Sequence, residues 1–275
     1  MSKLLSIITI NYNNALGLQK TIESILTQSF REFEYIIIDG ASTDGSVAII
    51  KEHENSINYW ISEQDKGVYN AMNKGLDKAT GDYVLFMNSG DFLYNNTVLK
   101  DVLDEVTLKN DLVYGDVLLK HEVNNWERLQ KHPQTPPFSY FFKQTICQQA
   151  CFIKRTLFDS IFYFNESYKI CADWEFLIYA IYIKKVNFKK IDTIIAIYDM
   201  QGISSTMEYR ELAKKERQQT IETYFPLFKN DYEKLSAYSS KRHQQLNKIE
   251  KSPFLRKIVS VFFKCCLFFL PRKKS

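Results

Sequence analysis

Several sequence motifs that would assign a common nucleotide or hydrolase chemistry are missing from this chain. It has no GxxxxGK[ST] loop, which argues against a P-loop kinase or ATPase. No GxGxxG follows the first predicted strand, which argues against a dinucleotide-dependent dehydrogenase. There is no GxSxG motif, and the four histidines stand in no convincing catalytic context. Hydrolase triads are therefore disfavoured.

Cysteines in metal-binding or disulfide patterns are also missing. The five cysteines are odd in number and form no CxxC pair, and Cys147 and Cys151 have no matching His or Cys pair. We therefore expect free thiols in a reducing cytosol rather than a zinc site. The apolar run at the N-terminus is short and has no small-residue cleavage site, so it indicates a first strand rather than a signal peptide.

Length and charge suggest one large domain with an appendage. The 275 residues are 45% hydrophobic and 25% charged, which is ordinary for a globular protein with a sizeable core. Charge is uneven along the chain: residues 208–275 carry 16 Lys or Arg and 7 Asp or Glu, a net +9, whereas the preceding residues sum to −5. A basic tail on an acidic module points to an anionic surface as the tail's partner.

Buried-strand patterns alternate with helical patterns through most of the chain. Leu4–Ile10 is a continuous apolar, β-branched run, typical of a strand covered on both faces, and apolar residues at helical spacing follow it up to Gln28. The other strands we expect are Tyr35–Ile38, Ile57–Ile61, Tyr83–Met87, Leu112–Leu119, Gln148–Ile153 and Ile191–Tyr198. The alternation predicts an α/β fold with a mostly parallel, Rossmann-like sheet and helices on both faces.

The pattern changes after residue 206. We predict a domain over residues 1–206 and a basic helical extension over 207–275, with charged helices at Glu208–Tyr224 and Lys229–Ile249. Ile258–Leu270, IVSVFFKCCLFFL, lies between basic flanks but is shorter than the roughly 20 apolar residues that span a bilayer. We therefore expect residues 253–275 to form an amphipathic helix in a membrane interface; a helix docked on the protein's own core is the alternative.

Three acidic residues stand near predicted strand ends: Asp39, Asp91 and, after a less certain element, Asp173. Each could be a simple turn residue or helix cap. Together they suggest an acidic cleft at the carboxyl edge of the sheet, which is where open α/β sheets bind ligands. Such a cleft suits a divalent cation, because magnesium-like ions take one or two carboxylates plus substrate phosphates.

Four motifs, in this order, carry a resemblance to a known family: SIITINYNN, YIIIDGASTDGS, SEQDKGVYNAMNKGLDKATGDYVLFMNSGD and ADWEFL. Over residues 4–205 the chain resembles the family 2 glycosyltransferases with the GT-A fold. The branch it resembles acts in bacterial capsule, exopolysaccharide and lipopolysaccharide assembly.

The resemblance implies roles for residues of the first half. Thr9 and Asn11 line the nucleotide pocket, and Asp39 accepts a hydrogen bond from the donor's base. Asp65 borders the nucleotide-sugar, and Lys74 approaches the diphosphate.

Asn88–Asp91 corresponds to the family's metal motif, with Asn88 and Ser89 near the nucleotide-sugar and Asp91 as the metal-binding acid. Asn88 and Gly90 stand where many relatives have Asp, which removes charge from the motif.

The second half would supply the acceptor side. Asp173 matches the family's general base, and Trp174 helps to form the acceptor site. Gln149, on a predicted strand, could bind sugar hydroxyls or be an ordinary polar strand residue. Gly202–Ser204 resembles the family's loop that closes over the donor, with a plain surface loop as the alternative.

The resemblance thus implies an inverting, Mn²⁺- or Mg²⁺-dependent glycosyltransferase. It would move a sugar from a UDP- or GDP-type donor to a hydroxyl of a lipid-linked or oligosaccharide acceptor. Expected partners include an anionic membrane surface at the inner face of the plasma membrane, and no nucleic acid. One alternative is a catalytically degenerate nucleotide-sugar-binding scaffold. A weaker one is nucleotidyl transfer, whose glycine-rich N-terminal loop is missing.

Overall fold

The computed structural model describes residues 4–105, 110–200, 207–238 and 241–269. The chain divides into two compact units, residues 1–224 and 225–275. The candidate active site lies in the first unit.

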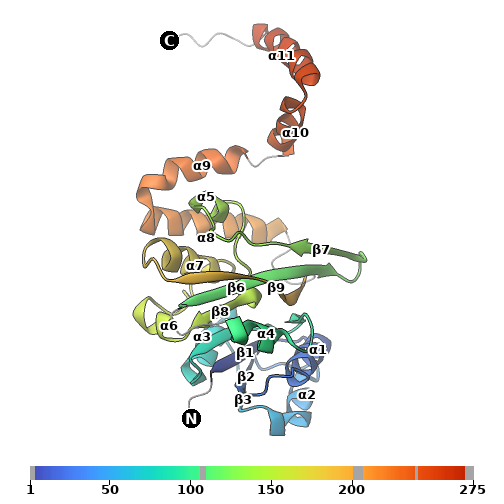
Figure 1. Ribbon diagram of the computed structural model, residues 1–275, viewed down its shortest axis with the longest axis vertical. Helices are drawn as coiled ribbons and strands as arrows, with labels where there is room; N and C mark the ends of the chain where they lie inside the picture. Colours follow the sequence, from blue (N-terminus) through green and yellow to red (C-terminus); the bar gives the residue numbers. More distant parts are fainter. Residues whose placement is uncertain (1–3, 106–109, 201–206, 239–240, 270–275) are drawn as a thin grey trace. The chain divides into compact units, whose positions relative to one another are not determined.

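One sheet of nine strands, with helices packed on it, forms the first unit (Figure 1). Its elements are β1 (Leu5–Asn11), α1 (Ala15–Leu26), β2 (Phe33–Asp39), α2 (Ser46–Glu52), η1 (Glu54–Ser56), β3 (Tyr59–Ser62), α3 (Val68–Lys78), β4 (Tyr83–Phe86), β5 (Phe92–Leu93), α4 (Val98–Glu105), β6 (Leu112–His121), β7 (Trp126–Gln130), α5 (Phe138–Phe141), η2 (Gln148–Ala150), β8 (Cys151–Lys154), α6 (Thr156–Ser160), α7 (Ala172–Tyr182), β9 (Phe188–Asp199) and α8 (Met207–Tyr224).

The first half of the sheet is parallel, in the order β3-β2-β1-β4. All seven residues of β1 and of β2 are buried, as their apolar runs predict. The register pairs Asn11 of β1 with Asp39 of β2, and Asp39 with Ser62 of β3. The carboxyl ends of three strands therefore meet at one edge.

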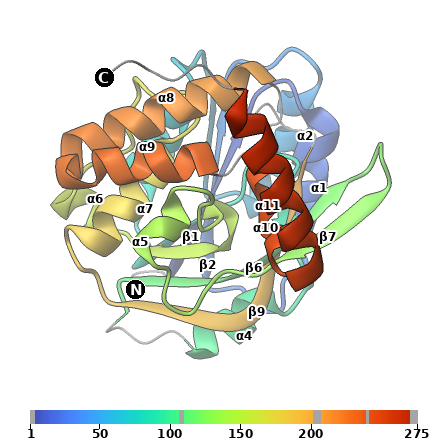
Figure 2. The ribbon, with the colours of Figure 1, turned by 90° about the horizontal axis from the view of Figure 1, so that it is seen from above.

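The second half is mixed, in the order β8-β6-β9-β5, with β7 paired to β6. Only β6 and β9 pair in parallel there; β4–β8, β6–β8, β6–β7 and β5–β9 are antiparallel. The mostly parallel prediction therefore holds for the first half, and the structure as a whole is an α/β fold with a mixed sheet. A short turn joins β6 to β7, and such a connection permits only an antiparallel pair. This hairpin extends away from the rest of the unit (Figure 2).

Helices cover both faces of the sheet, as predicted. Leu5 and Ile7 of β1 belong to a core cluster with Leu18 and Ile22 of α1. Ile8 points to the other face, where α3 packs so closely that a Cβ at Gly75 would lie 2.5 Å from the Ile8 Cγ2. The strict alternation of side chains along a strand makes this two-sided burial possible.

Two local expectations differ from the structure. The predicted strand Gln148–Ile153 is a 3₁₀ turn, η2, followed by the shorter strand β8. Over Lys229–Ile249, where one helix is expected, the described residues form α9 (Lys229–Tyr238) and α10 (Lys241–Glu250), and residues 239–240 lie outside the described part of the chain. The short strands β5 and β7 were not predicted.

Helix α8 belongs to the first unit, although the sequence pattern groups it with the basic extension. Ile221 is fully buried, and the Glu216 carboxylate accepts three backbone N–H bonds from residues 169–171, at 2.7–3.0 Å. The structural boundary therefore follows Tyr224 rather than residue 206.

The second unit comprises η4 (Pro226–Phe228), α9, α10 and α11 (Pro253–Phe268). Ser252 caps α11 by accepting from the Leu255 N–H, and Pro253 occupies the first turn, where a missing N–H costs nothing. No residue of α11 is buried. None of the helices in the described part of the chain combines the length and apolar character needed to cross a bilayer.

Candidate active site

Asp39 is the centre of a hydrogen-bonded group at the ends of the parallel strands. It is fully buried, and its Oδ1 accepts from the Asn11 Nδ2 at 2.7 Å and the Ser42 hydroxyl at 2.6 Å. Its Oδ2 accepts from the Ser42 N–H at 2.9 Å and the Ser62 hydroxyl at 2.6 Å. Asn11 keeps a buried Oδ1 that has no hydrogen-bond partner. The structure thus brings Asn11 and Asp39 together.

Asp65 lies beside this group. A Cβ at Gly40 would be 3.1 Å from the Asp65 Oδ2 and 3.2 Å from the Tyr12 ring, so Gly40 permits the close approach. Lys74 Nζ is 2.6 Å from Asp65 Oδ1 and 2.7 Å from Glu63 Oε1. Partial burial acts to lower the pKa of Lys74, but its bonds to Asp65 and Glu63 outweigh this and raise it. Lys74 is therefore a firmly charged ammonium, held by two acids.

Thr9 lies deeper in the sheet. Its side chain is fully buried, and its hydroxyl donates to the Met87 carbonyl at 2.8 Å and is 3.1 Å from the Tyr35 hydroxyl. The structure therefore places Thr9 beneath the strand ends rather than with Asp39.

The turn Asn88–Asp91 is held by α1. The Asn14 Nδ2 donates to the Ser89 carbonyl at 3.0 Å. The Asn14 Oδ1 caps α1 by accepting from the Gly17 N–H. Gly90 has φ +102°, a left-handed conformation that favours glycine. The Asn88 Oδ1 is buried without a hydrogen-bond partner. The turn is thus fixed in place and leaves one oxygen unused.

Asp91 is only 6% exposed and is bound from two sides. Its Oδ1 accepts from the Asp199 backbone N–H at 2.9 Å, and its Oδ2 accepts from the Gln149 Nε2 at 2.8 Å. Burial raises the pKa of Asp91 to about 7; the two hydrogen bonds oppose this shift, and the Asp199 charge adds to it. Gln149, expected on the acceptor side, therefore contacts the predicted metal-binding acid.

Asp199 is a further candidate for the site and was not predicted from the sequence. It ends β9, and its backbone reaches Asp91. The sequence could have indicated it, because Asp199 directly follows the predicted strand Ile191–Tyr198. Asp39 was selected for the same reason.

The oxygen atoms near Asp91 fit a hard divalent cation that also binds substrate phosphates. Two neighbouring carboxylates, Asp91 and Asp199, repel each other, and the Asn88 Oδ1 is a buried oxygen without a partner. Carboxylate and amide oxygens are the ligands that Mg²⁺ and Mn²⁺ prefer. Within the described residues, no three His, Cys, Asp or Glu side chains gather closely enough to hold a metal by themselves. Substrate phosphates would have to complete the coordination.

Asp173 lies in the first turn of α7 and is partly buried. The Tyr69 hydroxyl donates to its Oδ1 at 2.9 Å. Burial raises the pKa of Asp173, and the bonds from Tyr69 and the Trp174 N–H, with the Arg217 charge, oppose this. Such an acid is a stronger base than an exposed aspartate.

Trp174 is 1% exposed, and its indole N–H donates to the Phe141 carbonyl at 2.9 Å. The Arg217 guanidinium of α8 lies 5.3 Å from the centre of the indole ring. The Trp174 indole of α7 therefore contacts α5 and α8, and it does not reach the surface beside Asp173.

Asp91 and Asp173 lie near one buried thiol. Burial raises the pKa of Cys147, and the charges of Asp91 and Asp173 raise it further. The Cys147 Sγ also donates to the Gln149 Oε1 at 2.9 Å. Asp91 and Asp173 are thus both close enough to the Cys147 thiol for their charges to affect it. The predicted closing loop Gly202–Ser204 lies outside the described residues.

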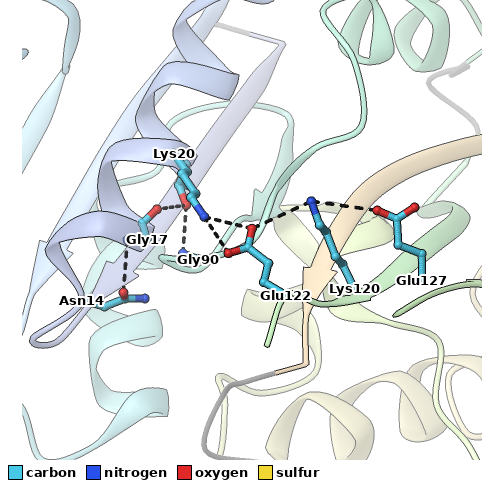
Figure 3. A network of polar contacts seen from close by, with 8 residues as sticks. Asn14, Gly17, Lys20, Gly90, Lys120, Glu122 and Glu127 are labelled. Atoms are coloured by element: carbon cyan, nitrogen blue, oxygen red, sulfur yellow. Dashed lines mark hydrogen bonds and ion pairs between the residues drawn. The ribbon is translucent and has the colours of Figure 1, made fainter. Parts of the chain in front are cut away.

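A surface pocket of about 210 Å³ adjoins this site. Its lining residues are Asn14, Leu16, Gly17, Lys20, Gly90, Phe92, Lys120, Glu122, Ile197 and Asp199. Figure 3 shows Lys20 of α1 pointing to Glu122, at 3.0 Å, with Lys120 between Glu122 and Glu127. Exposed ion pairs of this kind contribute about 0–1 kcal/mol each, so they close the pocket wall only weakly.

Comparisons with known proteins agree on a family. A family model described as "Glycosyl transferase family 2" matches residues 6–163. The PGL/p-HBAD biosynthesis glycosyltransferase of Mycobacterium tuberculosis (strain ATCC 25177 / H37Ra) is 32% identical over 222 residues, which cover 76% of this chain and 82% of that one. An uncharacterized glycosyltransferase of Haemophilus influenzae is 37% identical over 113 residues, which cover 40% of this chain and 44% of that one.

Two solved structures share the fold. S. aureus TarS 1–349 in complex with UDP-GlcNAc superposes with a TM-score of 0.60 at 21% identity, over 76% of this chain and 64% of that one. The chain thus spans less than two thirds of that protein's length. Mannosyltransferase PcManGT from Pyrobaculum calidifontis, in complex with GDP-Man and Mn²⁺, gives 0.64 at 14% identity, over 96% of this chain and 80% of that one.

Proposed function

The chain belongs to glycosyl transferase family 2, has the GT-A fold and is a glycosyltransferase, and from that premise we propose its reaction and its substrates. It transfers a sugar, with inversion, from a UDP- or GDP-linked donor to a hydroxyl of a lipid-linked or oligosaccharide acceptor in bacterial surface polysaccharide synthesis. The bound UDP-GlcNAc and GDP-Man of the two structural neighbours, and the name of the mycobacterial relative as a biosynthesis glycosyltransferase, support this choice.

One observation carries the proposal: two buried or partly buried acids, Asp91 and Asp173, lie near the same buried thiol, Cys147, in the unit whose strand ends hold the hydrogen-bonded group of Asp39. Asp39 and Asp65 form a polar wall suited to a nucleoside. Asp173 supplies a base on the other side. A two-substrate transfer needs both parts.

In the proposed reaction the acceptor hydroxyl attacks the anomeric carbon as its proton passes to the Asp173 carboxylate. The bond from that carbon to the diphosphate oxygen breaks, and the diphosphate leaves with the electron pair. A single in-line displacement inverts the anomeric centre. The raised pKa of Asp173 brings the base closer to the working pH, which favours proton transfer.

The metal that the family implies would be held by Asp91, with Asp199 and the Asn88 Oδ1 as further oxygen ligands. When bound, a divalent cation acts as a Lewis acid that neutralises charge on a leaving diphosphate. Gln149 and the Asp199 N–H orient the Asp91 carboxylate for this task.

Donor turnover with added Mn²⁺ tests the proposal. Asp91→Ala and Asp173→Asn are expected to lower transfer by at least about a hundredfold, because each removes a group required in the transition state. Asp104→Asn, at a 65% exposed carboxylate paired with Lys100, is the matched control. Wild-type rates in both site variants would refute the assignment.

A scaffold that binds nucleotide-sugar without transferring it is the second candidate. The uncharged Asn88 and Gly90 in the metal motif favour it. It predicts stabilisation by donor or nucleotide with no turnover of either donor type, since a ligand that binds the native state raises its stability.

We place the reaction at the cytoplasmic face of the plasma membrane, with α11 in the membrane interface. Along α11, Phe254, Ile258 and Phe262 follow one another at intervals of four residues and are 51–71% exposed. Arg256, Ser260 and Lys264 repeat the same interval two positions further on, hence on the opposite side of the helix. An apolar side opposite a basic side suits an anionic bilayer surface.

Flotation with phosphatidylglycerol-containing vesicles tests this placement. Phe262→Asp puts a charge on the apolar side and is expected to abolish recovery with the vesicles, as is truncation after Lys251. Ser260→Asp adds the same charge to the basic side and serves as the control, with partial retention. Equal flotation of the wild type, the truncated chain and Phe262→Asp would remove the membrane from the proposal.

A further inference from the structure

Helix α3 touches both halves of the candidate active site. Residues at intervals of four lie on one side of a helix, so Tyr69 and Asn73 share one side of α3, and Asn70 and Lys74 share a neighbouring one. The contacts of the two sides lead to different parts of the chain.

The side of Asn70 and Lys74 holds the loop that borders the nucleoside wall. Lys74 binds Asp65 and Glu63, and its Nζ is 3.3 Å from the Gln64 carbonyl. Asn70 accepts the Lys66 N–H on its Oδ1 at 3.1 Å. The loop 63–66 is thus tied to α3 by side chains at both ends.

The side of Tyr69 and Asn73 holds the segment that leads into α7. Asn73 bonds both backbone groups of Phe164, donating to its carbonyl at 2.9 Å and accepting its N–H at 3.0 Å. The Glu166 carboxylate accepts from Asn73 and from Asn70, each at 3.0 Å. Asn70 therefore contacts both halves with one amide group.

Tyr69 makes the contact that reaches the base. It is 5% exposed, its ring lies 5.7 Å from the Phe164 ring, and its hydroxyl donates to the Asp173 Oδ1 at 2.9 Å. Burial and the nearby Asp173 charge raise the pKa of Tyr69 well above its ordinary value. The phenol therefore stays protonated and acts as a donor at any working pH.

We propose that Tyr69 is the positioning residue of the base: its hydroxyl occupies one oxygen of Asp173 and turns the other toward the acceptor, and α3 makes this geometry depend on the donor-side loop 63–66. The inference rests on the proposed function, since it assumes that Asp173 is the base.

The chemistry of a carboxylate explains why this contact matters. A rotating carboxylate offers either oxygen in many directions, whereas one that is bonded at Oδ1 presents Oδ2 in one direction. A donor to the ionised form also keeps a partly buried acid deprotonated, against the effect of burial. Both effects favour proton removal from an acceptor.

Other groups near Asp173 would influence its titration, and the experiment has to separate them from Tyr69. They are Arg217 on α8 and the thiols of Cys147, Cys151 and Cys171. Burial raises the pKa of all three thiols, so they remain neutral and add no charge at pH 5–9. Arg217 is charged throughout that range. Removing the Tyr69 hydroxyl should therefore shift the acid limb of the dependence of kcat on pH, and no other of these groups titrates in that range.

The test is steady-state transfer by Tyr69→Phe between pH 5 and 9. Loss of a hydrogen bond to a charged group predicts a kcat about tenfold lower, with the KM for the donor unchanged. The acid limb of kcat should move upward by about one pH unit, because the ionised base has lost a stabilising donor. Tyr114→Phe removes another buried hydroxyl, bonded to the Pro133 carbonyl at 2.8 Å, and should leave the limb in place.

Asn73→Ser is the second variant, since it loosens the Phe164 segment and leaves the Tyr69 hydroxyl intact. A smaller fall in kcat, with a smaller upward shift of the same limb, is expected. An unmoved limb in Tyr69→Phe would overturn the inference, as would a change confined to KM, which would make Tyr69 a direct binding residue. Wild-type activity in Asp173→Asn would instead overturn the proposed function, so the two failures are distinguishable.

Discussion

Two buried glutamates in this protein should respond to the same substitution in opposite ways. Glu175, in α7, is 3% exposed and has one carboxylate oxygen without a hydrogen-bond partner. Burial raises its pKa from 4.5 to about 7; a bond from Asn165 opposes the shift and the Glu216 charge adds to it. Glu34, in β2, is 7% exposed and accepts bonds from Ser6, Thr80 and Gly81, which lower its pKa despite burial.

The sign follows from proton binding. The folded state binds the Glu175 proton more tightly than the unfolded state, so the free energy of unfolding falls as pH rises from about 4.5 to about 7. Between these values the loss is about 3.5 kcal/mol, because the pKa rises from 4.5 to about 7 and each pH unit corresponds to about 1.4 kcal/mol. Glu175→Gln stays neutral, so its stability should approach that of the wild type toward pH 4.5 and exceed it by up to about 3.5 kcal/mol at pH 8.

Glu34→Gln should do the reverse. The Glu34 carboxylate oxygens accept from donors on every bonded side. A glutamine NH₂ group in place of one oxygen would leave buried donors without an acceptor, at a cost of about 1–3 kcal/mol each. Glu34 stabilises the fold above its unfolded pKa, and this contribution is lost as pH falls through its lowered folded pKa. The glutamine variant should therefore be destabilised at pH 8 and approach the wild type in acid.

Urea unfolding at pH 5, 6, 7 and 8, followed by tryptophan fluorescence, to which the buried Trp174 contributes, measures both changes. The reasoning is refuted if Glu175→Gln is no more stable than the wild type at pH 8, or if both variants shift in the same direction.

Three further outcomes are expected. Gly90→Ala should lower the free energy of unfolding in urea by about 1–3 kcal/mol and lower activity, because φ is +102° and the new Cβ would lie 3.2 Å from the Asn14 Nδ2. Gly45→Ala is the control: at φ +100° with open space around it, it should cost backbone strain alone and keep activity. Mn²⁺ should raise the melting temperature of the wild type but not of Asp91→Asn, measured by calorimetry; an equal rise would place the ion elsewhere. Trp174→Phe should lower stability by about 1–3 kcal/mol through the lost bond to Phe141 while leaving the acceptor KM unchanged, because the indole is buried.

Much of the first half of the fold could be predicted because its strands are buried on both faces. Continuous apolar runs such as Leu5–Ile10 and Tyr35–Ile38 have few alternatives to a central parallel strand. Their carboxyl ends then meet by necessity, so the strand pattern could place Asp39 at this edge, whereas Asn11 was selected only through the family resemblance.

The second half was less predictable, because its pairing depends on contacts distant in sequence. Gln149 is polar in a segment of strand-like composition, and only the turn η2 aims it at Asp91, 58 residues away. Trp174 stands next to Asp173 in the chain, but neighbours on a helix point in different directions, and its indole packs beneath α8. Whether an aromatic residue is core or site is decided by such packing, which local sequence does not encode.

The four hydrogen bonds on Asp39 have a consequence for how strongly a donor's base can be recognised. Every acceptor direction of this carboxylate is already in use, by Asn11, Ser42 and Ser62. A base that binds there must replace a hydroxyl, so it gains only the difference between two similar bonds. For the proposed donors, the choice between uracil and guanine at Asp39 would then be nearly even in free energy, and most of the affinity would come from the phosphates and the sugar.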